Sequence, residues 1–246
     1  MQLSAYLMKS RLFLLASLAL ALSLALPSPA AALSQKEAEA LLQDTFTIHG
    51  YVELNGEKDY AGNPANIVAA ALFGAFDSAM SRHAENDRLK EEGGKPLPKD
   101  APLFTVAGQA LAPGEVVSRD DEPAIFKGRP EQFNYFISRK AVELAALRFT
   151  GRVIKTHVAP KSGMLADTVM TDKGYFVAID GLGDLGEEPV LKKVEPKGSG
   201  FVLTGVLEQT MGEPEPGVKP AHFKLVLAPG DQPGTWKRQF STTTDK

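Results

Sequence analysis

The sequence predicts an α+β fold in which an antiparallel meander sheet packs against one or two helices. Two apolar helical patterns lie in the first 150 residues, and short strand-like segments separated by Gly- and Pro-rich turns fill most of the remainder. Regular strands joined by short turns are typical of antiparallel sheets. The apolar side of each helix requires a partner surface, and a sheet with one apolar face supplies it.

The strongest predicted helix begins at Asn63-Pro64. Asn is a favoured N-cap residue, and Pro at the first helical position loses no useful hydrogen-bond donor. Apolar side chains then recur at spacings of three and four residues, which gives a stripe wide enough to bury against a sheet. They are Ile67, Val68, Ala71, Leu72, Ala75, Phe76, Ala79 and Met80. Asp77 and Arg82 argue against a membrane span, and a core-facing helix is favoured over a groove for a partner helix.

A second helix is predicted from Arg139 to Phe149, with Ser138 as its N-cap and Gly151 ending it. Nearer the N-terminus, Ser34 is expected to cap a short helix, with Glu37 completing a capping box.

Strands are predicted from alternating apolar and polar residues. The first covers 45–54, where Phe46, Ile48, Val52 and Leu54 alternate with polar residues, and Asn55-Gly56 follows as a turn. A short strand is expected within 104–109. After the second helix, six further candidates cover 152–158, 174–179, 190–195, 201–208, 222–227 and 236–241.

The charged, then Gly- and Pro-rich stretch 82–102 is the best candidate for a linker. It divides the chain into a signal peptide (1–32), a strand–helix portion (33–81), the linker (82–102) and a helix-plus-sheet domain (103–246). The order of a helix followed by a curved antiparallel sheet is similar to that of cystatin-like and nuclear-transport-factor-like folds. This similarity concerns architecture alone.

The first 32 residues have the order of a cleavable export signal. Lys9 and Arg11 are their only charges, and 15 uncharged, mostly apolar residues (12–26) follow. Prolines and small residues come next, which places the cut after Ala32, with Ala30 and Ala32 at positions −3 and −1. A helix of that length spans roughly 22 Å, short of the roughly 30 Å hydrocarbon core, and this disfavours a permanent membrane anchor. We therefore expect a periplasmic or secreted protein without a membrane span.

Composition excludes several classes of function. The chain has no cysteine, so disulfides, thiol catalysis, Cys-based zinc sites and iron–sulfur clusters are ruled out. The whole chain has 27 Lys and Arg and 30 Asp and Glu, and two of the basic residues lie in the predicted signal, so the mature chain carries a net charge of −5. Without a concentrated basic footprint, no nucleic-acid partner is expected.

One segment (181–186) reads G-x-G-x-x-G, the pattern of dinucleotide-binding loops. In nucleotide sites the element after the loop is a helix whose N-terminal amides hold the pyrophosphate. Here Glu187, Glu188 and Pro189 follow and lead into a strand-like segment, so we expect a hairpin loop and no bound cofactor.

The same loop offers Asp180, Asp184, Glu187 and Glu188 as oxygen ligands for calcium. The spacing departs from the EF-hand pattern, and a solvated acidic turn is favoured over a loose calcium site.

No other pattern identifies a reaction or a metal site. The four histidines, His49, His83, His157 and His222, are far apart in the sequence, and His49 is expected on the exposed face of a strand. No nucleophile elbow of the G-x-S-x-G type is present. Trp236, the sole tryptophan, is expected to pack against a helix rather than to stack on a ligand.

Two hypotheses for function remain. The first is an exported, non-catalytic binding or interaction protein of the cell envelope, with a small molecule or a protein as its partner. The second is an extracytoplasmic hydrolase whose carboxylates and histidine are brought together by the fold. A pocket that gathers His49 or His157 with two carboxylates would favour catalysis, and an apolar cleft would favour binding.

Overall fold

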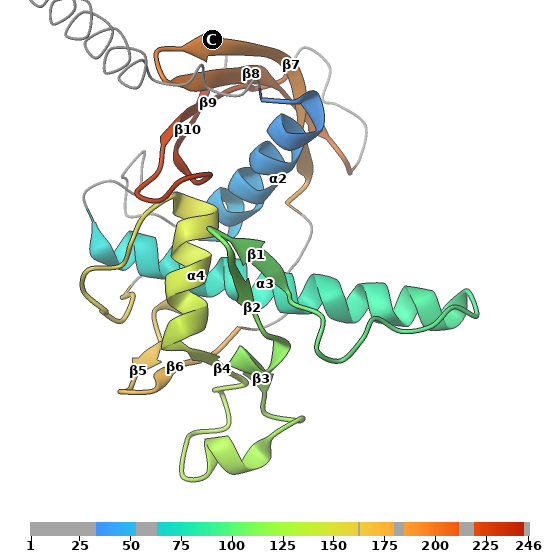
Figure 1. Ribbon diagram of the computed structural model, residues 1–246, viewed down its shortest axis with the longest axis vertical. Coiled ribbons are helices and arrows are strands. Elements are labelled where there is room, and N and C mark those ends of the chain that lie inside the picture. Colours follow the sequence, from blue (N-terminus) through green and yellow to red (C-terminus); the bar gives the residue numbers. More distant parts are fainter. Residues whose placement is uncertain (1–32, 53–62, 162, 180–184, 212–218, 244–246) are drawn as a thin grey trace, which may run out of the picture. The chain divides into compact units, whose positions relative to one another are not determined.

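The computed structural model describes residues 33–52, 63–161, 163–179, 185–211 and 219–243. Within these ranges it contains three α-helices and three antiparallel sheets, at about 36% helix and 30% strand, which confirms the α+β class (Figure 1). Residues 35–246 form one compact unit. The predicted signal peptide with Ala30 and Ala32, and the predicted turn at Asn55-Gly56, lie outside the described residues.

Helix α2 (Gln35–Tyr51) begins directly after Ser34 and covers most of the segment predicted as a strand at 45–54. That prediction is wrong because the apolar spacing is helical when it is counted from the start of the helix. The buried side chains of α2 are Ala38, Leu42, Thr45, Phe46 and Ile48. The Thr45 hydroxyl donates to the Leu41 carbonyl at 2.6 Å, so this polar group is satisfied inside the helix.

Helix α3 (Pro64–Glu91) begins as the sequence predicts. Asn63 is the N-cap, and its side-chain oxygen accepts a hydrogen bond from the Ala65 N–H at 2.9 Å. From Val68 to Phe76 every residue is buried, so the middle of this helix is enclosed on all sides rather than along one stripe. The apolar side chains of this stretch therefore form the centre of the core.

The helix continues to Glu91, so the first ten residues of the stretch 82–102 are helical. The chain then returns alongside α3 (Figure 1). The Arg82 guanidinium donates to the Pro98 and Ala101 carbonyls, and the Leu97 N–H donates to the Asn86 side chain at 2.8 Å. The returning segment 97–103, which we call the strap, is thereby held on α3. The division of the chain into domains at this stretch stays a prediction.

Helix α4 (Arg139–Thr150) has both predicted ends. The Ser138 hydroxyl accepts a hydrogen bond from the Ala141 N–H at 3.1 Å, and Gly151 adopts the left-handed conformation at φ 66°. Both features follow from local chemistry, because a short polar side chain satisfies the first free N–H groups and Gly tolerates a positive φ.

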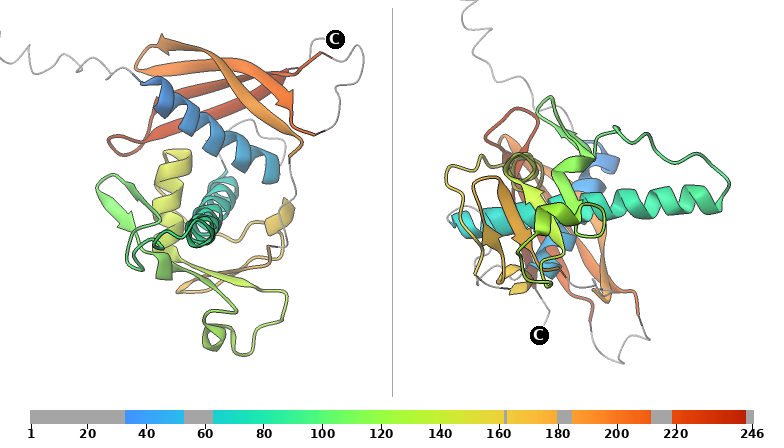
Figure 2. Two further views of the ribbon diagram at one scale, coloured as in Figure 1. Left: turned by 90° about the vertical axis from the view of Figure 1, so that its right-hand side faces the viewer. Right: turned by 90° about the horizontal axis from the view of Figure 1, so that it is seen from below.

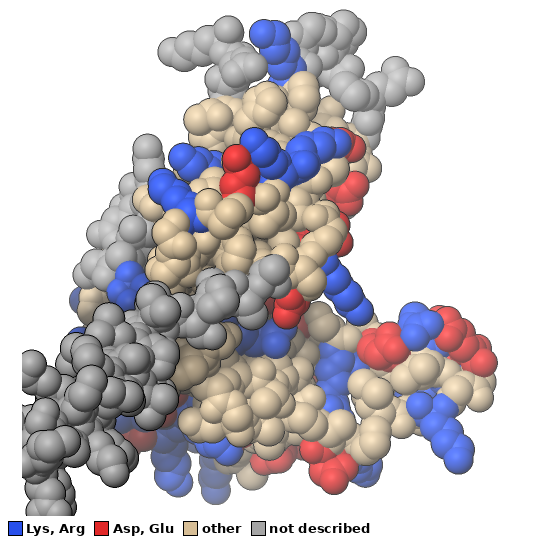
Figure 3. All heavy atoms as spheres, turned by 45° about the horizontal axis from the view of Figure 1, so that its top comes forward, with Lys and Arg blue, Asp and Glu red and all other residues tan. Residues whose placement is uncertain are grey.

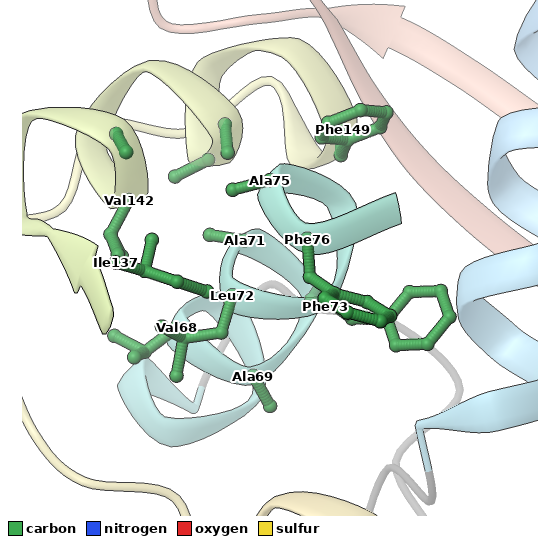
Figure 4. Packing of buried hydrophobic residues seen from close by; sticks show 14 of the residues in the cluster. Val68, Ala69, Ala71, Leu72, Phe73, Ala75, Phe76, Ile137, Val142 and Phe149 are labelled. Carbon is green, nitrogen blue, oxygen red and sulfur yellow. The ribbon is translucent and has the colours of Figure 1, made fainter. Parts of the chain in front are cut away.

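Helices α3 and α4 pack closely where small residues meet large ones (Figure 4). Ala71 and Ala75 of α3 face α4, and Ile137 and Val142 fill the space beside them. A Cβ added at Gly74 would lie 2.3 Å from the Phe149 ring, so glycine is what allows the two helices to approach at this point.

Four of the predicted strands, at 190–195, 201–208, 222–227 and 236–241, are confirmed in a four-stranded antiparallel sheet with the order β10-β9-β8-β7. Its strands are β7 (Glu187–Lys197), β8 (Gly200–Gln209), β9 (His222–Pro229) and β10 (Trp236–Thr243). Consecutive strands are neighbours, so the sheet is the predicted meander. One face is buried through Phe201 and Leu203 of β8 and Phe223 and Leu225 of β9, and α2 packs against the sheet (Figure 2).

A second four-stranded sheet has the order β3-β4-β6-β5 and lies against α3 and α4. Its strands are β3 (Val116–Ser118), β4 (Tyr135–Ser138), β5 (Val169–Met170) and β6 (Gly174–Val177). The strand predicted at 174–179 is β6. The single strand predicted within 104–109 is instead a hairpin of β1 (Phe104–Val106) and β2 (Gln109–Leu111).

The strand predicted at 152–158 is wrong. This segment has no strand partner in the described chain and runs as a loop that is held by individual hydrogen bonds. The Val153 N–H donates to an Asp231 carboxylate oxygen at 3.0 Å, and the Asp231 N–H donates to the Gly151 carbonyl at 2.8 Å. Local alternation alone does not make a strand, because a strand also requires a neighbouring edge to pair with.

Two features require glycine at position 151: its positive φ and the close approach of the β10 backbone. A Cβ at this position would lie 2.2–2.4 Å from backbone atoms of Trp236 and Lys237. We expect Gly151→Ala to lower the free energy of unfolding by about 3 kcal/mol or more, since overpacking adds to left-handed strain. Gly128→Ala is the matched control, because Gly128 has φ 77° and open space around its Cβ position. The control should cost about 1 kcal/mol. Equal losses in urea unfolding would contradict the proposed clash.

Candidate functional site

His49 does not occupy the exposed position expected of it. It lies on α2, half-buried, with its ring 5.1 Å from that of Phe240 in β10. Burial lowers the pKa of the His49 imidazole, which favours its neutral form. The correction follows from the helical conformation of α2, which turns His49 toward the sheet rather than toward solvent.

His157 lies between α4 and the second sheet. Its Nε2 is 3.0 Å from a carboxylate oxygen of Glu143, and its Nδ1 is 2.8 Å from the Tyr175 hydroxyl. Tyr175 is fully buried, and burial raises its pKa to about 12. The buried phenol has no surface for a substrate, and the contacts of His157 hold its loop onto α4 and β6. Among the described residues, Glu143 is the one carboxylate that contacts His157, whereas the hydrolase hypothesis requires two.

The other two histidines lie elsewhere, with His83 beside Asp87 on the surface of α3 and His222 at the start of β9. In the described ranges no group of three His, Cys, Asp or Glu side chains is placed to hold a metal ion. Residues 180–184 of the G-x-G-x-x-G segment and of the possible calcium loop are outside those ranges. The segment from Glu187 is strand β7, as predicted, rather than the helix that a nucleotide site requires.

A polar cleft of about 410 Å³ lies where α2, α3, α4 and the strap meet. This volume is in the ordinary range for small-molecule sites. Its charged lining residues are Asp44, Asp77, Arg82 and Arg148. Its apolar wall comprises Leu97, Pro102, Leu103 and Phe149. The cleft combines an apolar wall with a few charged groups, which is the usual composition of a ligand site.

Asp77 is the acidic group of this cleft without an ion-pair partner among the described residues. It follows the buried stretch of α3 and is itself partly buried, yet its carboxyl group has no hydrogen-bond or ion-pair partner among the described residues. Burial, and secondarily the negative charge of Asp44, raises the pKa of Asp77. An ionisable group with a perturbed pKa in a cleft is a candidate for function.

Asp44 has the opposite environment. One of its carboxylate oxygens is 3.7 Å from an Arg148 guanidinium nitrogen and 3.8 Å from a nitrogen of Arg238. Two cations therefore lie close to the Asp44 carboxylate, whereas no described cation forms an ion pair with Asp77. The two carboxyl groups of the cleft are thus chemically distinct.

Two other cavities are weaker candidates for a ligand site than this cleft. One, of about 230 Å³, lies between the start of α3 and residues 152–156. The other, of about 430 Å³, lies between α3 and β3 and is bordered by Asp120, Asp121 and Glu122. Neither contains a partly buried carboxyl group without a partner. In the view of Figure 3, basic and acidic side chains are interspersed rather than gathered by sign.

Comparisons with protein families, with curated proteins and with solved structures find no match to this chain. Among the described residues, none of the helices has the length and apolar character needed to cross a membrane.

One residue of the sequence, Asp77, does indicate a polar site near this cleft. Asp77 directly follows Phe76 in the apolar pattern of α3, and its charge served to argue against a membrane span. A carboxylate inside a buried helical stripe also indicates a polar site, because such a group is costly to bury without a partner. Asp44 and Arg148 gave no comparable signal, since isolated charges are common on helices.

We expect opposite effects on stability from neutralising the two carboxylates. The pKa of Asp77 is raised in the folded state, so between its unfolded and folded pKa values the folded chain binds more protons than the unfolded chain. As pH rises through this interval, ionisation of Asp77 lowers the free energy of unfolding. Asp77→Asn should therefore stabilise the protein at neutral pH, and the gain should vanish below the ordinary carboxyl pKa. Asp44→Asn should destabilise it by about 1–3 kcal/mol, because Arg148 and Arg238 lose their counter-charge. Urea unfolding at several pH values checks both, and a less stable Asp77→Asn variant would contradict the assignment.

Proposed function

We propose that this chain is an exported, non-catalytic binding protein of the cell envelope and that its ligand binds in the cleft between α2, α3, α4 and the strap. The observation that carries the proposal is Asp77, a partly buried carboxyl group without a partner in the described chain, at the surface of a cleft large enough for a small molecule. The Asp77 carboxyl lines the cleft, so a ligand bound there can donate a hydrogen bond to it.

Other groups around the cleft support binding rather than nucleophilic chemistry. The Ser78 hydroxyl donates to the Gly74 carbonyl at 2.7 Å, so it serves its own helix. No histidine lines the described cleft, and a serine nucleophile needs an adjacent base.

A second candidate is an extracytoplasmic hydrolase, favoured by the contrast between Asp44 and Asp77. Hydrolysis by two carboxyl groups uses one as the proton donor and the other as the base, and a raised pKa suits the donor. Asp77, whose pKa burial raises, would be the proton donor, and Asp44, beside Arg148 and Arg238, would be the second carboxyl group. The histidine of the original hypothesis has no place in this arrangement.

Export is proposed from the first 32 residues, whose charge and apolar pattern match a cleaved signal. We expect the protein recovered from the cell envelope to begin at Leu33. N-terminal sequencing or intact-mass measurement checks this, with Ala32→Arg as the variant that should block cleavage at the predicted position. A functional protein that retains Met1, or one found in the cytosol, would contradict the proposal.

Ligand binding is testable by thermal unfolding with a panel of small amines, carboxylic acids, sugars and short peptides. A compound present at about 100 times its Kd stabilises by roughly 2.7 kcal/mol, which corresponds to about 5–10 °C for a domain of this size. Ser81→Trp should remove the shift, because Ser81 lines the cleft and a bulky side chain there fills it. Glu91→Trp is the matched control, an exposed position at the far end of the same helix.

Failure of every compound class, or an undiminished shift in Ser81→Trp, would contradict binding in this cleft. Chromatography of the recovered ligand separates the two candidates. A binding protein returns the compound unchanged, whereas a hydrolase releases two products and loses turnover when Asp77 is replaced by Asn.

A further inference from the structure

The two cations that line the cleft, Arg82 and Arg148, contact groups other than Asp77. Arg82 donates to two carbonyl groups of the strap, at Pro98 and Ala101. Arg148 faces Asp44 and lies with its guanidinium 5.2 Å from the centre of the Phe149 ring. Neither of these cations forms an ion pair with Asp77, so among the described residues no positive charge is paired with this carboxyl group.

The position of Asp77 suits it to bind a charged group of a ligand. It is a hydrogen-bond acceptor in a partly buried position, and Asp44 adds repulsion to the cost of ionising it. A cation placed against Asp77 would offset both effects, because it attracts both carboxylates and restores a hydrogen-bond donor. A neutral donor would restore the hydrogen bond alone.

We infer that the ligand of this cleft presents an ammonium or guanidinium cation to Asp77 and an apolar body to the wall formed by Leu97, Leu103 and Phe149. This inference rests on the proposed function and names the chemical class of the ligand. The apolar wall selects against small inorganic cations, because those ions gain nothing from hydrocarbon contact and lose their hydration.

Binding of such a cation is coupled to proton release. The charged groups around Asp77 in the cleft are Asp44 from α2, Arg82 from α3 and Arg148 from α4, and the strap contributes only uncharged lining residues. A bound cation favours ionised Asp77, so it lowers a pKa that burial and Asp44 had raised. Between the bound and free pKa values the carboxyl group loses a proton as the ligand binds.

The test uses three compounds that share a phenyl group and a two-carbon spacer and differ in the charge of the head group: phenethylamine, phenethyl alcohol and hydrocinnamate. Each is titrated calorimetrically into the wild-type protein, Asp77→Asn and Glu91→Gln. Glu91→Gln removes the same charge from α3 at a position outside the cleft. Two buffers with different ionisation heats report the protons released.

The titrations are repeated from about pH 4 to about pH 7. Wild type and Glu91→Gln should bind the amine about tenfold more tightly than the alcohol, with proton release in the part of this range where free Asp77 is protonated. Asp77→Asn should bind the two compounds equally and release no proton. Equal affinities in the wild type, or tighter binding of hydrocinnamate, would overturn the cation inference and leave the proposed function standing. Tighter hydrocinnamate binding would point to Arg148, whose Nε is a buried donor without a hydrogen-bond partner in the described chain. If none of the three binds, the cation inference fails, whereas the proposed function fails only if the wider panel also fails.

Discussion

The buried guanidinium of Arg238 joins the three elements around which the described chain is organised. Its side chain is 1% exposed and lies on β10, the last strand. It donates to the Thr45 hydroxyl at 3.1 Å on α2 and to the Arg148 carbonyl at 2.7 Å near the end of α4. A buried guanidinium is tolerated only when its hydrogen bonds and charge are compensated, so α2 and α4 must both sit where their acceptors reach it. The two contacts therefore fix the sheet relative to the helices.

The cleft is a consequence of the same arrangement. Placing α2 beside α4 brings Asp44 to face both Arg148 and Arg238, which gives this carboxylate two cations. Asp77 lies on α3 and lines the same space, yet no described cation forms an ion pair with it. The protein thus satisfies one carboxyl group and leaves the other for an external partner. This contrast, rather than any sequence motif, is what makes the cleft a candidate site.

Local chemistry explains which elements were predictable. The caps at Asn63 and Ser138, and the end of α4 at Gly151, depend on side chains within a few residues and were found as expected. The strands of the meander were also found, because each has its neighbour next in the chain. The strands predicted at 45–54 and at 152–158 are wrong, because alternation over a few residues does not by itself specify a strand. The first segment is inside a helix, and the second has no neighbouring edge to pair with.

The sequence by itself determined the α+β class, the ends of two helices and the order of the sheet, because these depend on interactions between residues close along the chain. It also determined the absence of cysteine chemistry. Only the tertiary structure decided which carboxyl groups have partners. Arg238 reaches an acceptor 193 positions earlier in the chain, and Asp77 lacks a partner only because of what surrounds it in space. Whether a charged group finds a partner depends on distances in the folded structure, and these distances cannot be read from spacing along the sequence.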